Sequence, residues 1–301
     1  MSETEHRGSV VESHDGITVI ECTACGWRHV WPLPSLSDME VYYGESDAFY
    51  RTHSPKDWWA VEDAEEPYHR LVYADYLDML ATYASKPLDK PLTLLDVGCG
   101  SGLLLHVAMH KGWEGTGIEP SPQARARAAE RGVYVQSSMD GMKAQFDAAA
   151  MILVLEHVLD PLAMLRAIRE RLVDGGSLIV LTPNDFNPLQ EVARKVHGLP
   201  AWWCVKPHIS YFSVESLRVL MMKAGFEIVD TRATWPVEIA LLQGTQYVGN
   251  EELGRAMYRE KMAYETALYT HGQTELLRQT QRNYAQQGIG REIIMVGVKE
   301  S

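Results

Sequence analysis

Length, composition and charge set the first limits on this chain. Its 301 residues suffice for one α/β domain with insertions or for two smaller domains, and 46% apolar with 23% charged residues is typical of a folded globular protein. The formal net charge of −12 disfavours binding to nucleic-acid phosphates or to anionic membranes. We therefore expect a small-molecule partner, with no nucleic acid and no membrane.

Three features of the sequence predict a cytoplasmic location. The longest wholly apolar run, residues 148–155, is far shorter than the roughly 20 residues needed to span a bilayer. Residues 1–15 alternate charged and polar side chains and lack the apolar centre of a secretory signal, so we expect a frayed tail there. The cysteines are too few for a disulfide framework in a chain of this length: they are Cys22, Cys25, Cys99 and Cys204.

The first 90 residues precede any regular alternation of strands and helices. Residues 1–35 hold the tail and a Cys-x-x-Cys knuckle. Residues 36–90 are rich in aromatic side chains within a helical stretch, and we interpret them as a lid. Residues 91–301 form the main domain, with a mostly polar helical insertion at 250–285 before the last strand.

Apolar runs of strand length alternate with helical segments from residue 92 onward. We expect seven strands, at 92–97, 114–119, 133–136, 146–154, 177–181, 226–233 and 292–298. Ser-Pro and Asp-Pro pairs mark the starts of the helices at 122 and 161. Strands joined by crossover helices are parallel neighbours, which predicts a Rossmann-like, doubly wound, mostly parallel sheet. Residues 184–212, rich in Pro, Trp and His, are expected to form a loop.

A glycine-rich segment, Leu-Leu-Asp-Val-Gly-Cys-Gly-Ser-Gly at 94–102, joins the first strand to the first helix. Its glycines permit a sharp turn and a close approach of the backbone to a ligand. A dinucleotide fingerprint needs a third glycine at position 103 or 105, where this chain has leucine, so a nicotinamide-dependent oxidoreductase is disfavoured. Asp96 favours a ligand with a cationic amino-acid end instead.

Glu119 stands at the end of the second strand. An acidic side chain at that place can accept hydrogen bonds from both ribose hydroxyls of a nucleoside. The alternative is that Asp96 and Glu119 are two solvated loop carboxylates. Their combination at neighbouring strand ends favours a site for a nucleoside with an amino-acid end.

These segments resemble the successive motifs of class I S-adenosylmethionine-dependent methyltransferases. The motifs are L-L-D-V-G-C-G-S-G, G-I-E-P-S, F-D-A-A-A-M-I-L-V-L-E-H-V-L-D-P and G-G-S-L-I-V-L-T-P-N, and the resemblance covers residues 92–233. It implies S-adenosyl-L-methionine as the cofactor. The residues it implies around the cofactor are Asp96, Gly98 and Gly100 at the methionine part, Glu119 at the ribose, Ser138 and Met139 at the adenine, Leu155, Glu156 and His157 beneath the sulfonium, and Cys99, Gly102 and Pro120 beside them.

The N-terminal knuckle, Cys22-Thr-Ala-Cys25-Gly, and the segment 207–213 resemble regions of bacterial methyltransferases that act on sugars and secondary metabolites. Related enzymes often bind zinc with two such cysteine pairs, but this chain has no second pair. His14 and His29 could complete a tetrahedral site, and the alternative is a tight turn left from a lost site. Some ring O-methyltransferases of this superfamily hold a catalytic metal with a Glu three residues before the Glu-His pair, but this chain has Leu153 at that position. We therefore predict no metal.

Methyl transfer to a hydroxyl of a small molecule, such as a sugar, a sugar nucleotide or a secondary metabolite, needs orientation and a base. We expect His208 to remove the proton and His157 to position cofactor and acceptor, while the alternative is that both histidines are structural. Trp202, Trp203 and Tyr211 could stack on the acceptor or could seal a core. The alternative function is a non-catalytic, S-adenosylmethionine-binding interaction protein, and a homodimer is compatible with either function.

Overall fold

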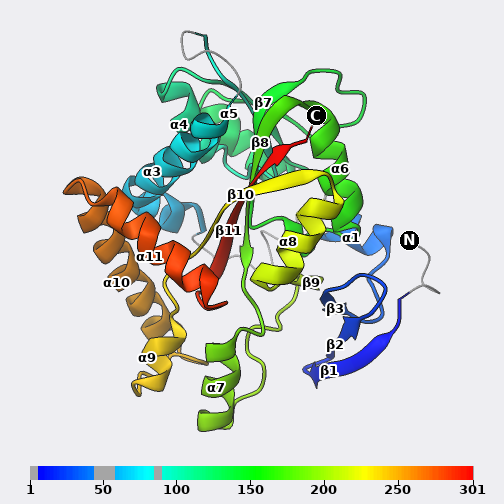
Figure 1. The fold of residues 1–301 in the computed structure, drawn as a ribbon, viewed down its shortest axis with the longest axis vertical. Coiled ribbons are helices and arrows are strands. Elements are labelled where there is room, and N and C mark those ends of the chain that lie inside the picture. Colours follow the sequence, from blue (N-terminus) through cyan, green and yellow to red (C-terminus); the bar gives the residue numbers. More distant parts are fainter. Residues whose placement is uncertain (1–5, 44–57, 85–89, 301) are drawn as a thin grey trace.

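The computed structural model describes residues 6–43, 58–84 and 90–300 and contains a seven-stranded sheet in the order β10-β11-β8-β7-β4-β5-β6 (Figure 1). The strands β8, β7, β4, β5 and β6 pair in parallel, and β11 pairs antiparallel with both β8 and β10. This confirms the predicted Rossmann-like, mostly parallel sheet. The strands are β4 (Thr93–Val97), β5 (Glu114–Ile118), β6 (Tyr134–Gln136), β7 (Phe146–Ile152), β8 (Leu172–Pro183), β10 (Phe226–Ala233) and β11 (Glu292–Lys299).

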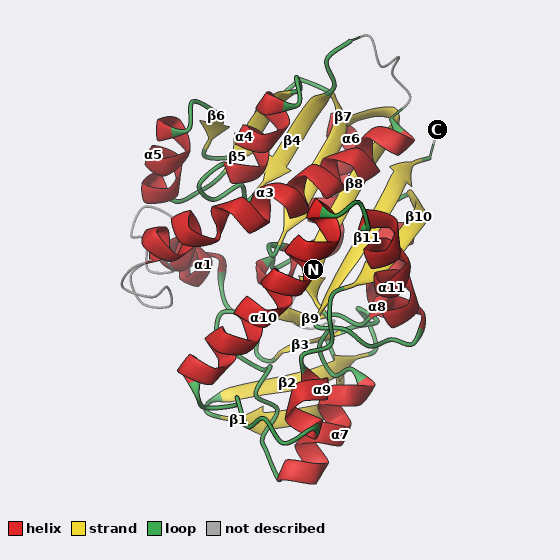
Figure 2. Cartoon of the chain, turned by 90° about the vertical axis from the view of Figure 1, so that its left-hand side faces the viewer, coloured by secondary structure: helices red, strands yellow, loops and turns green. Residues whose placement is uncertain are grey.

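Both faces of the sheet are covered by helices, as a doubly wound sheet requires (Figure 2). Strand β7 shows why: Ala149 and Met151 belong to the apolar cluster on one face, and Ala148 and Ala150 belong to the cluster on the other. The first face is covered by α6 (Pro161–Arg171) and α8 (Val214–Lys223), and the second by α3 (Trp58–Tyr83) and α4 (Leu103–His110). The remaining helix of the central unit is α5 (Pro122–Glu130).

The helix starts follow the cap signals in the sequence. The hydroxyl of Ser121 accepts a hydrogen bond from the backbone N–H of Ala124, and the carboxylate of Asp160 accepts one from Ala163. A proline occupies the first turn in both α5 and α6, where its missing N–H costs nothing. The two helices therefore begin where the sequence predicts.

The N-terminal residues form a second sheet in the order β1-β2-β3-β9, seen at the lower right of Figure 1. Its strands are β1 (Gly8–His14), β2 (Ile17–Cys22), β3 (Arg28–Val30) and β9 (Ser210–Tyr211), and helix α1 (Leu36–Tyr43) follows β3. The expectation of a frayed tail over residues 1–15 is wrong from Gly8 onward. Asp15 and Gly16, both with positive φ, make the tight turn of a β1–β2 hairpin.

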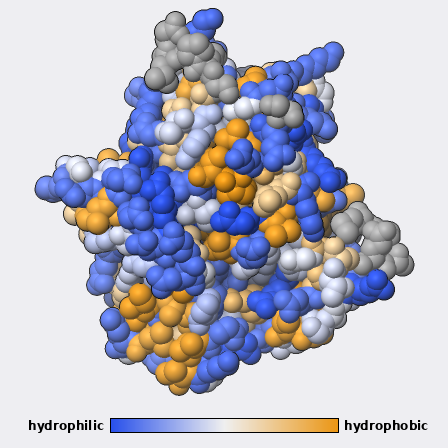
Figure 3. Space-filling model, viewed as in Figure 1, coloured by the Kyte–Doolittle hydropathy of each residue, from blue (hydrophilic) through white to orange (hydrophobic). Residues whose placement is uncertain are grey.

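The segment 184–212, expected to be a loop, contains helix α7 (Pro188–His197) and strand β9. Asn187 caps α7 by accepting hydrogen bonds from the N–H groups of Leu189 and Gln190. The cap and the following proline were visible in the sequence, whereas a two-residue strand is defined only by its partner, β3. Apolar side chains reach the surface over α7 and the nearby α9 (Glu238–Leu242) at the lower end of Figure 3: Val192, Val196 and Leu242.

The insertion before the last strand is the helix pair α10 (Glu251–Thr270) and α11 (Thr274–Gln286), which confirms the helical segment expected at 250–285. A buried ionic network ties this pair to the domain. Arg232 of β10 bonds to both Asp230 and Asp75, and Arg278 of α11 also contacts Asp75. Because Asp75 lies on α3, one carboxylate joins helices from both ends of the chain.

The division into tail, lid and main domain stays a prediction. Helix α3 contributes both to the apolar core and to the wall of a cavity. Leu77 and Leu80 are fully buried in the apolar cluster on the sheet, whereas Trp58, Trp59 and Glu62 line the cavity described below. No helix in the described part of the chain is both long enough and apolar enough to cross a membrane.

Candidate active site

The loop between β4 and α4 adopts a conformation that favours glycine. Gly98, Gly100 and Gly102 have φ values of 73°, 52° and 73°, in the left-handed region. A Cβ atom at position 98 would lie 2.4 Å from Cγ2 of Val154. The side chain of any other residue would therefore disturb the backbone turn on which the site is built.

Two adjoining cavities lie at the carboxyl ends of the parallel strands. The first, of about 540 Å³, is lined by Asp96, Gly98, Cys99, Gly100, Glu156, His157 and His208, among others. The second, of about 430 Å³, is lined by Glu119, Pro120, Ser138 and Met139. Gly98, Leu153 and His157 line both cavities. Ligands of open α/β sheets bind in this crevice.

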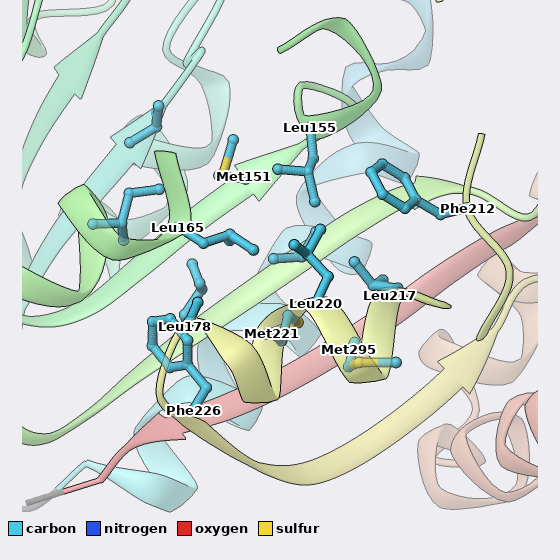
Figure 4. Close-up of a cluster of buried hydrophobic side chains, with 14 of the residues drawn as sticks. Met151, Leu155, Leu165, Leu178, Phe212, Leu217, Leu220, Met221, Phe226 and Met295 are labelled. Carbon is cyan, nitrogen blue, oxygen red and sulfur yellow. The ribbon is translucent and has the colours of Figure 1, made fainter. Parts of the chain in front are cut away.

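Two of the expected cofactor-binding residues, Gly102 and Leu155, line neither cavity. Leu155 is fully buried and packs in the apolar cluster with Phe212 and Leu217 (Figure 4). Gly102 precedes the first residue of α4, and a Cβ atom there would lie 2.5 Å from Val133. Both residues hold the backbone of the site and do not form its walls.

The two acidic side chains, Asp96 and Glu119, are buried with exposed fractions of 3% and 7%. The Glu119 carboxylate accepts hydrogen bonds from the N–H groups of Gly100 (3.0 Å) and Ser121 (2.9 Å). Burial, and then the charge of Glu119, raise the pKa of Asp96 to about 7. A cationic ligand group beside Asp96 would favour its charged form again.

His157 and His208 come together although they lie in different segments. His157 ends the 3₁₀ helix η2 (Leu155–His157) after β7, and its ring centroid lies 5.0 Å from that of His208, with the rings nearly perpendicular. Burial lowers the pKa of His157 to about 4. Burial, followed by the influence of His157 and Arg291, lowers the pKa of His208 to about 3. Both rings are therefore neutral at pH 7 and have a lone pair available.

Glu156 is the third polar group at this place. It is 1% exposed, and its carboxyl accepts a hydrogen bond of 3.0 Å from the hydroxyl of Thr182. Burial raises its pKa to about 8, so the group is mostly protonated at neutral pH. Glu156, His157 and His208 each offer one ligand-type atom within 4.8 Å of the other two. The expectation of no catalytic metal, which considered only Leu153, stays a prediction.

The sequence interpretation missed several residues around the first cavity. Arg291 immediately precedes the last strand, β11, and it donates to Asp185 at 3.1 Å. Glu62 accepts a hydrogen bond from the hydroxyl of Ser101 at 2.5 Å, which ties α3 to the glycine loop. Only the tertiary fold brings these positions to the crevice.

Of the two alternatives left open for Trp203 and Tyr211, stacking on an acceptor or sealing a core, the structure favours the second. They are 1% and 2% exposed and form a separate apolar cluster with Ile17 and Val19 of the N-terminal sheet. Trp202 packs against the same cluster. These aromatic side chains seal the junction between the N-terminal sheet and the segment after β8, as the alternative interpretation proposed.

Comparison with known proteins identifies the family. The profile of the methyltransferase domain family matches residues 68–231. A ubiquinone biosynthesis O-methyltransferase of Xanthomonas campestris is 32% identical over 164 residues, which are 51% of this chain and 66% of that protein. One from Cereibacter sphaeroides is 31% identical over 199 residues, which are 58% of this chain and 80% of that protein.

Solved structures share the fold at low sequence identity. The magnesium protoporphyrin IX methyltransferase of Synechocystis, crystallised with S-adenosylhomocysteine, has a TM-score of 0.51 and 14% identity, over 88% of this chain and all of that one. A SAM-dependent methyltransferase of Archaeoglobus fulgidus has a TM-score of 0.50 and 15% identity, over 81% of this chain and all of that one.

The residues present fit S-adenosylmethionine. The glycine turn leaves no room for a Cβ atom at position 98, Asp96 and Glu119 provide buried carboxylates, and Met139 and Val158 give the second cavity apolar walls suited to a purine. The family profile matches more than half of the chain, and the seven-stranded sheet is mostly parallel, as predicted from the same segments. The chain therefore belongs to the family of class I S-adenosylmethionine-dependent methyltransferase domains.

Proposed function

We propose that this protein transfers a methyl group to a hydroxyl of a small molecule, with His208 as the base and His157 as a positioning residue. One observation carries the assignment of the base. The Nδ1 atom of His208 is buried at the first cavity and has no hydrogen-bond partner among the described residues. A buried nitrogen without a partner is costly, and an acceptor hydroxyl that donates to it would remove that cost.

The residues around the two cavities support a mechanism in which the rate enhancement comes mainly from orienting the cofactor and the acceptor. S-adenosylmethionine, when bound, supplies an electrophilic methyl group. Asp96 and the glycine loop would hold its amino-acid end, Glu119 its ribose, and Ser138 with Met139 its adenine. Holding two reactants in an attack geometry can supply roughly 7 to 11 kcal/mol of the barrier. His157 lines both cavities, so it lies where cofactor and acceptor would meet.

The substrate class rests on composition and relatives. The relatives named above are O-methyltransferases, and the net charge of −12 supports a small-molecule acceptor over a nucleic acid. The resemblance of the knuckle favours a sugar, sugar nucleotide or secondary metabolite. All four cysteines are unpaired, which supports a cytoplasmic location.

Two measurements test this function in order. Calorimetry with S-adenosylhomocysteine should show that Glu119→Ala loses about 1 to 3 kcal/mol of binding free energy, because ribose hydroxyls lose their acceptor. Labelled S-adenosylmethionine is then offered with a panel of sugars, sugar nucleotides and phenols, and mass spectrometry locates the methyl group. Binding of the cofactor without transfer to any acceptor would favour the alternative, an interaction protein that binds S-adenosylmethionine. Label on nitrogen or carbon would contradict the hydroxyl assignment.

A further inference from the structure

Four ligand-type side chains converge in the N-terminal sheet, outside both cavities of the active site. They are His6, Cys22, Cys25 and His29, and their ligand atoms all lie within 4.8 Å of one another. Cys22, Cys25 and His29 are 1%, 4% and 2% exposed. His6 lies two residues before β1, Cys22 ends β2, and His29 lies in the middle of β3. We propose that these four residues bind one structural zinc ion.

Hydrogen bonding alone does not explain the cluster. The Nδ1 atom of His6 lies 3.1 Å from Nε2 of His29, 3.8 Å from Sγ of Cys22 and 3.3 Å from Sγ of Cys25. An imidazole nitrogen has either one proton or one lone pair, so it makes one good hydrogen bond. Three contacts at one nitrogen are expected when all four atoms surround a shared cation.

The spacing of the atoms matches tetrahedral zinc. Zinc binds thiolate sulfur at about 2.3 Å and histidine nitrogen at about 2.0 to 2.1 Å. A tetrahedron with these bonds has edges of about 3.3 Å between two nitrogens and about 3.6 Å between nitrogen and sulfur. The three distances from His6 Nδ1 agree with these edges to within a few tenths of an ångström.

The surrounding backbone orients the ligands. Nδ1 of His29 lies 2.8 Å from the carbonyl oxygen of Val30, so it carries the proton and leaves the lone pair on Nε2, toward the cluster. Gly26 donates its N–H to the carbonyl of Cys22 at 2.9 Å with a φ of 87°, which makes the tight turn between the two cysteines. Thr23 donates to the carbonyl of Arg7 at 3.0 Å and so fixes the chain beside His6.

The sequence-based expectation about the ligands changes in one respect. His29 belongs to the cluster, but His14 lies at the other end of β1, opposite Ile17, with its Nδ1 atom 3.4 Å from Glu12. His6 takes the place expected for His14. Two histidines thus replace the second cysteine pair whose absence led to the prediction of no metal. Four protein ligands leave no open position, so the site is structural and not catalytic.

The ion would stabilise the strand β3 and the knuckle, which hydrogen-bond to the residues directly after His208. Val30 of β3 donates its N–H to the carbonyl of Ile209 at 2.8 Å, and Ile209 donates to the carbonyl of Glu156 at 2.8 Å. Trp27, between the knuckle and β3, donates its indole N–H to the hydroxyl of Ser210 at 3.2 Å. The metal cluster and the histidine pair are therefore joined through one short run of backbone hydrogen bonds.

Metal analysis of the full chain tests the proposal. Protein purified from zinc-supplemented cultures should contain one zinc ion per chain, and the chelator-treated protein should recover one on titration with zinc chloride. Replacing zinc with cobalt should give the intense visible absorption of tetrahedral cobalt with thiolate ligands. The variants Cys25→Ser and His6→Gln should each lose at least tenfold in zinc affinity, the scale expected for loss of a ligand or its support.

The matched control is His14→Gln, which removes a histidine at the far end of β1 that lies outside the cluster. It should bind zinc like the wild type. His6→Gln is the more informative variant, because His6 is partly exposed and precedes the first strand, so the fold can be checked by circular dichroism. Zinc-free wild-type protein that takes up no zinc on titration would overturn the proposal. So would Cys25→Ser or His6→Gln protein that binds zinc as tightly as the control.

Discussion

The ring of His208 meets the ring of His157 edge to face, with centroids 5.0 Å apart, at the crevice where cofactor and acceptor are expected to meet. The two rings nevertheless differ in their hydrogen-bond surroundings. Nδ1 of His157 lies 3.4 Å from the carbonyl of Pro207, whereas Nδ1 of His208 has no partner among the described residues. This difference is the reason for proposing His208, and not His157, as the base.

The first prediction concerns this pair. His208→Gln should lower turnover by about 10² to 10⁴ with little change in cofactor affinity, because it removes the base and keeps the volume. His157→Gln should weaken cofactor binding and turnover together. Steady-state kinetics and calorimetry on both variants check this. Wild-type turnover in His208→Gln would show that positioning alone suffices.

The second prediction concerns the pH dependence of cofactor binding. The pKa of Asp96 is about 7 without ligand because burial and Glu119 favour the neutral form. A cationic ligand group selects the charged form, so affinity for S-adenosylhomocysteine should rise as pH increases toward 7 and level off above it. Calorimetry in buffers of different ionisation enthalpy should detect proton release below that pH. Asp96→Asn should bind more weakly and lose the dependence; a flat wild-type profile would contradict this account.

The third prediction concerns the effect of Glu156 on the pH dependence of the free energy of unfolding. Its folded-state pKa of about 8 exceeds the unfolded value, so its contribution to stability is complete at low pH and is lost as pH rises through about 8. Glu156→Gln resembles the protonated form at every pH. The variant should therefore gain stability relative to wild type as pH rises from about 4.5 to about 8, by up to a few kcal/mol, and the difference should stay constant above that range. Urea unfolding at several pH values measures this, with the exposed Glu251→Gln as control.

A pH-independent difference between Glu156→Gln and wild type would show that Glu156 is charged in the folded protein. In that case the carboxylate would be a stronger candidate for holding a cation together with His157 and His208. Turnover measured with and without a chelator would then decide whether a catalytic metal is needed.

The fourth prediction concerns the ionic network between α3, β10 and α11. Asp75 is 4% exposed and contacts both Arg232 and Arg278. Asp75→Ala should lower the free energy of unfolding by about 3 to 5 kcal/mol, because it leaves the buried Arg232 without one of its partners. Arg255→Ala breaks an exposed pair with Glu251 and should cost less than about 1 kcal/mol. Equal losses in the two variants would mean that the buried network adds no stability.

The sequence predicts the central sheet well because the local signals there agree with the tertiary structure. Apolar runs such as Phe146–Ile152 have the length of a buried strand, and Ser121 and Asp160 mark helix starts that the structure confirms. The N-terminal sheet was missed because β1 has little apolar surface of its own and is defined by its pairing with β2. Even so, Asp15 and Gly16 carried the signal of a tight hairpin turn.

The residues of the candidate site also fall into those that the sequence predicts and those that only the fold reveals. Asp96, Glu119 and the glycines follow from position at strand ends, so sequence reasoning finds them. His208 was suggested only by the resemblance of segment 207–213, whereas Arg291 and Glu62 reach the crevice from a distant loop and helix, and no periodicity reveals that. The sequence did not reveal His6 as a ligand, because the other residues of its cluster come from β2, β3 and the turn between them and meet only in the folded protein.

The pairing of β3 with β9 has a practical consequence for constructing chimeric enzymes. Ser210 and Tyr211 belong to a sheet whose other strands come from the first 30 residues, and His208 stands two positions before that strand. Recombination that exchanges only the amino-terminal part, or only the segment after β8, would break this shared sheet. Acceptor preference should therefore transfer between homologues only when residues 6–43 and 199–213 are transplanted together.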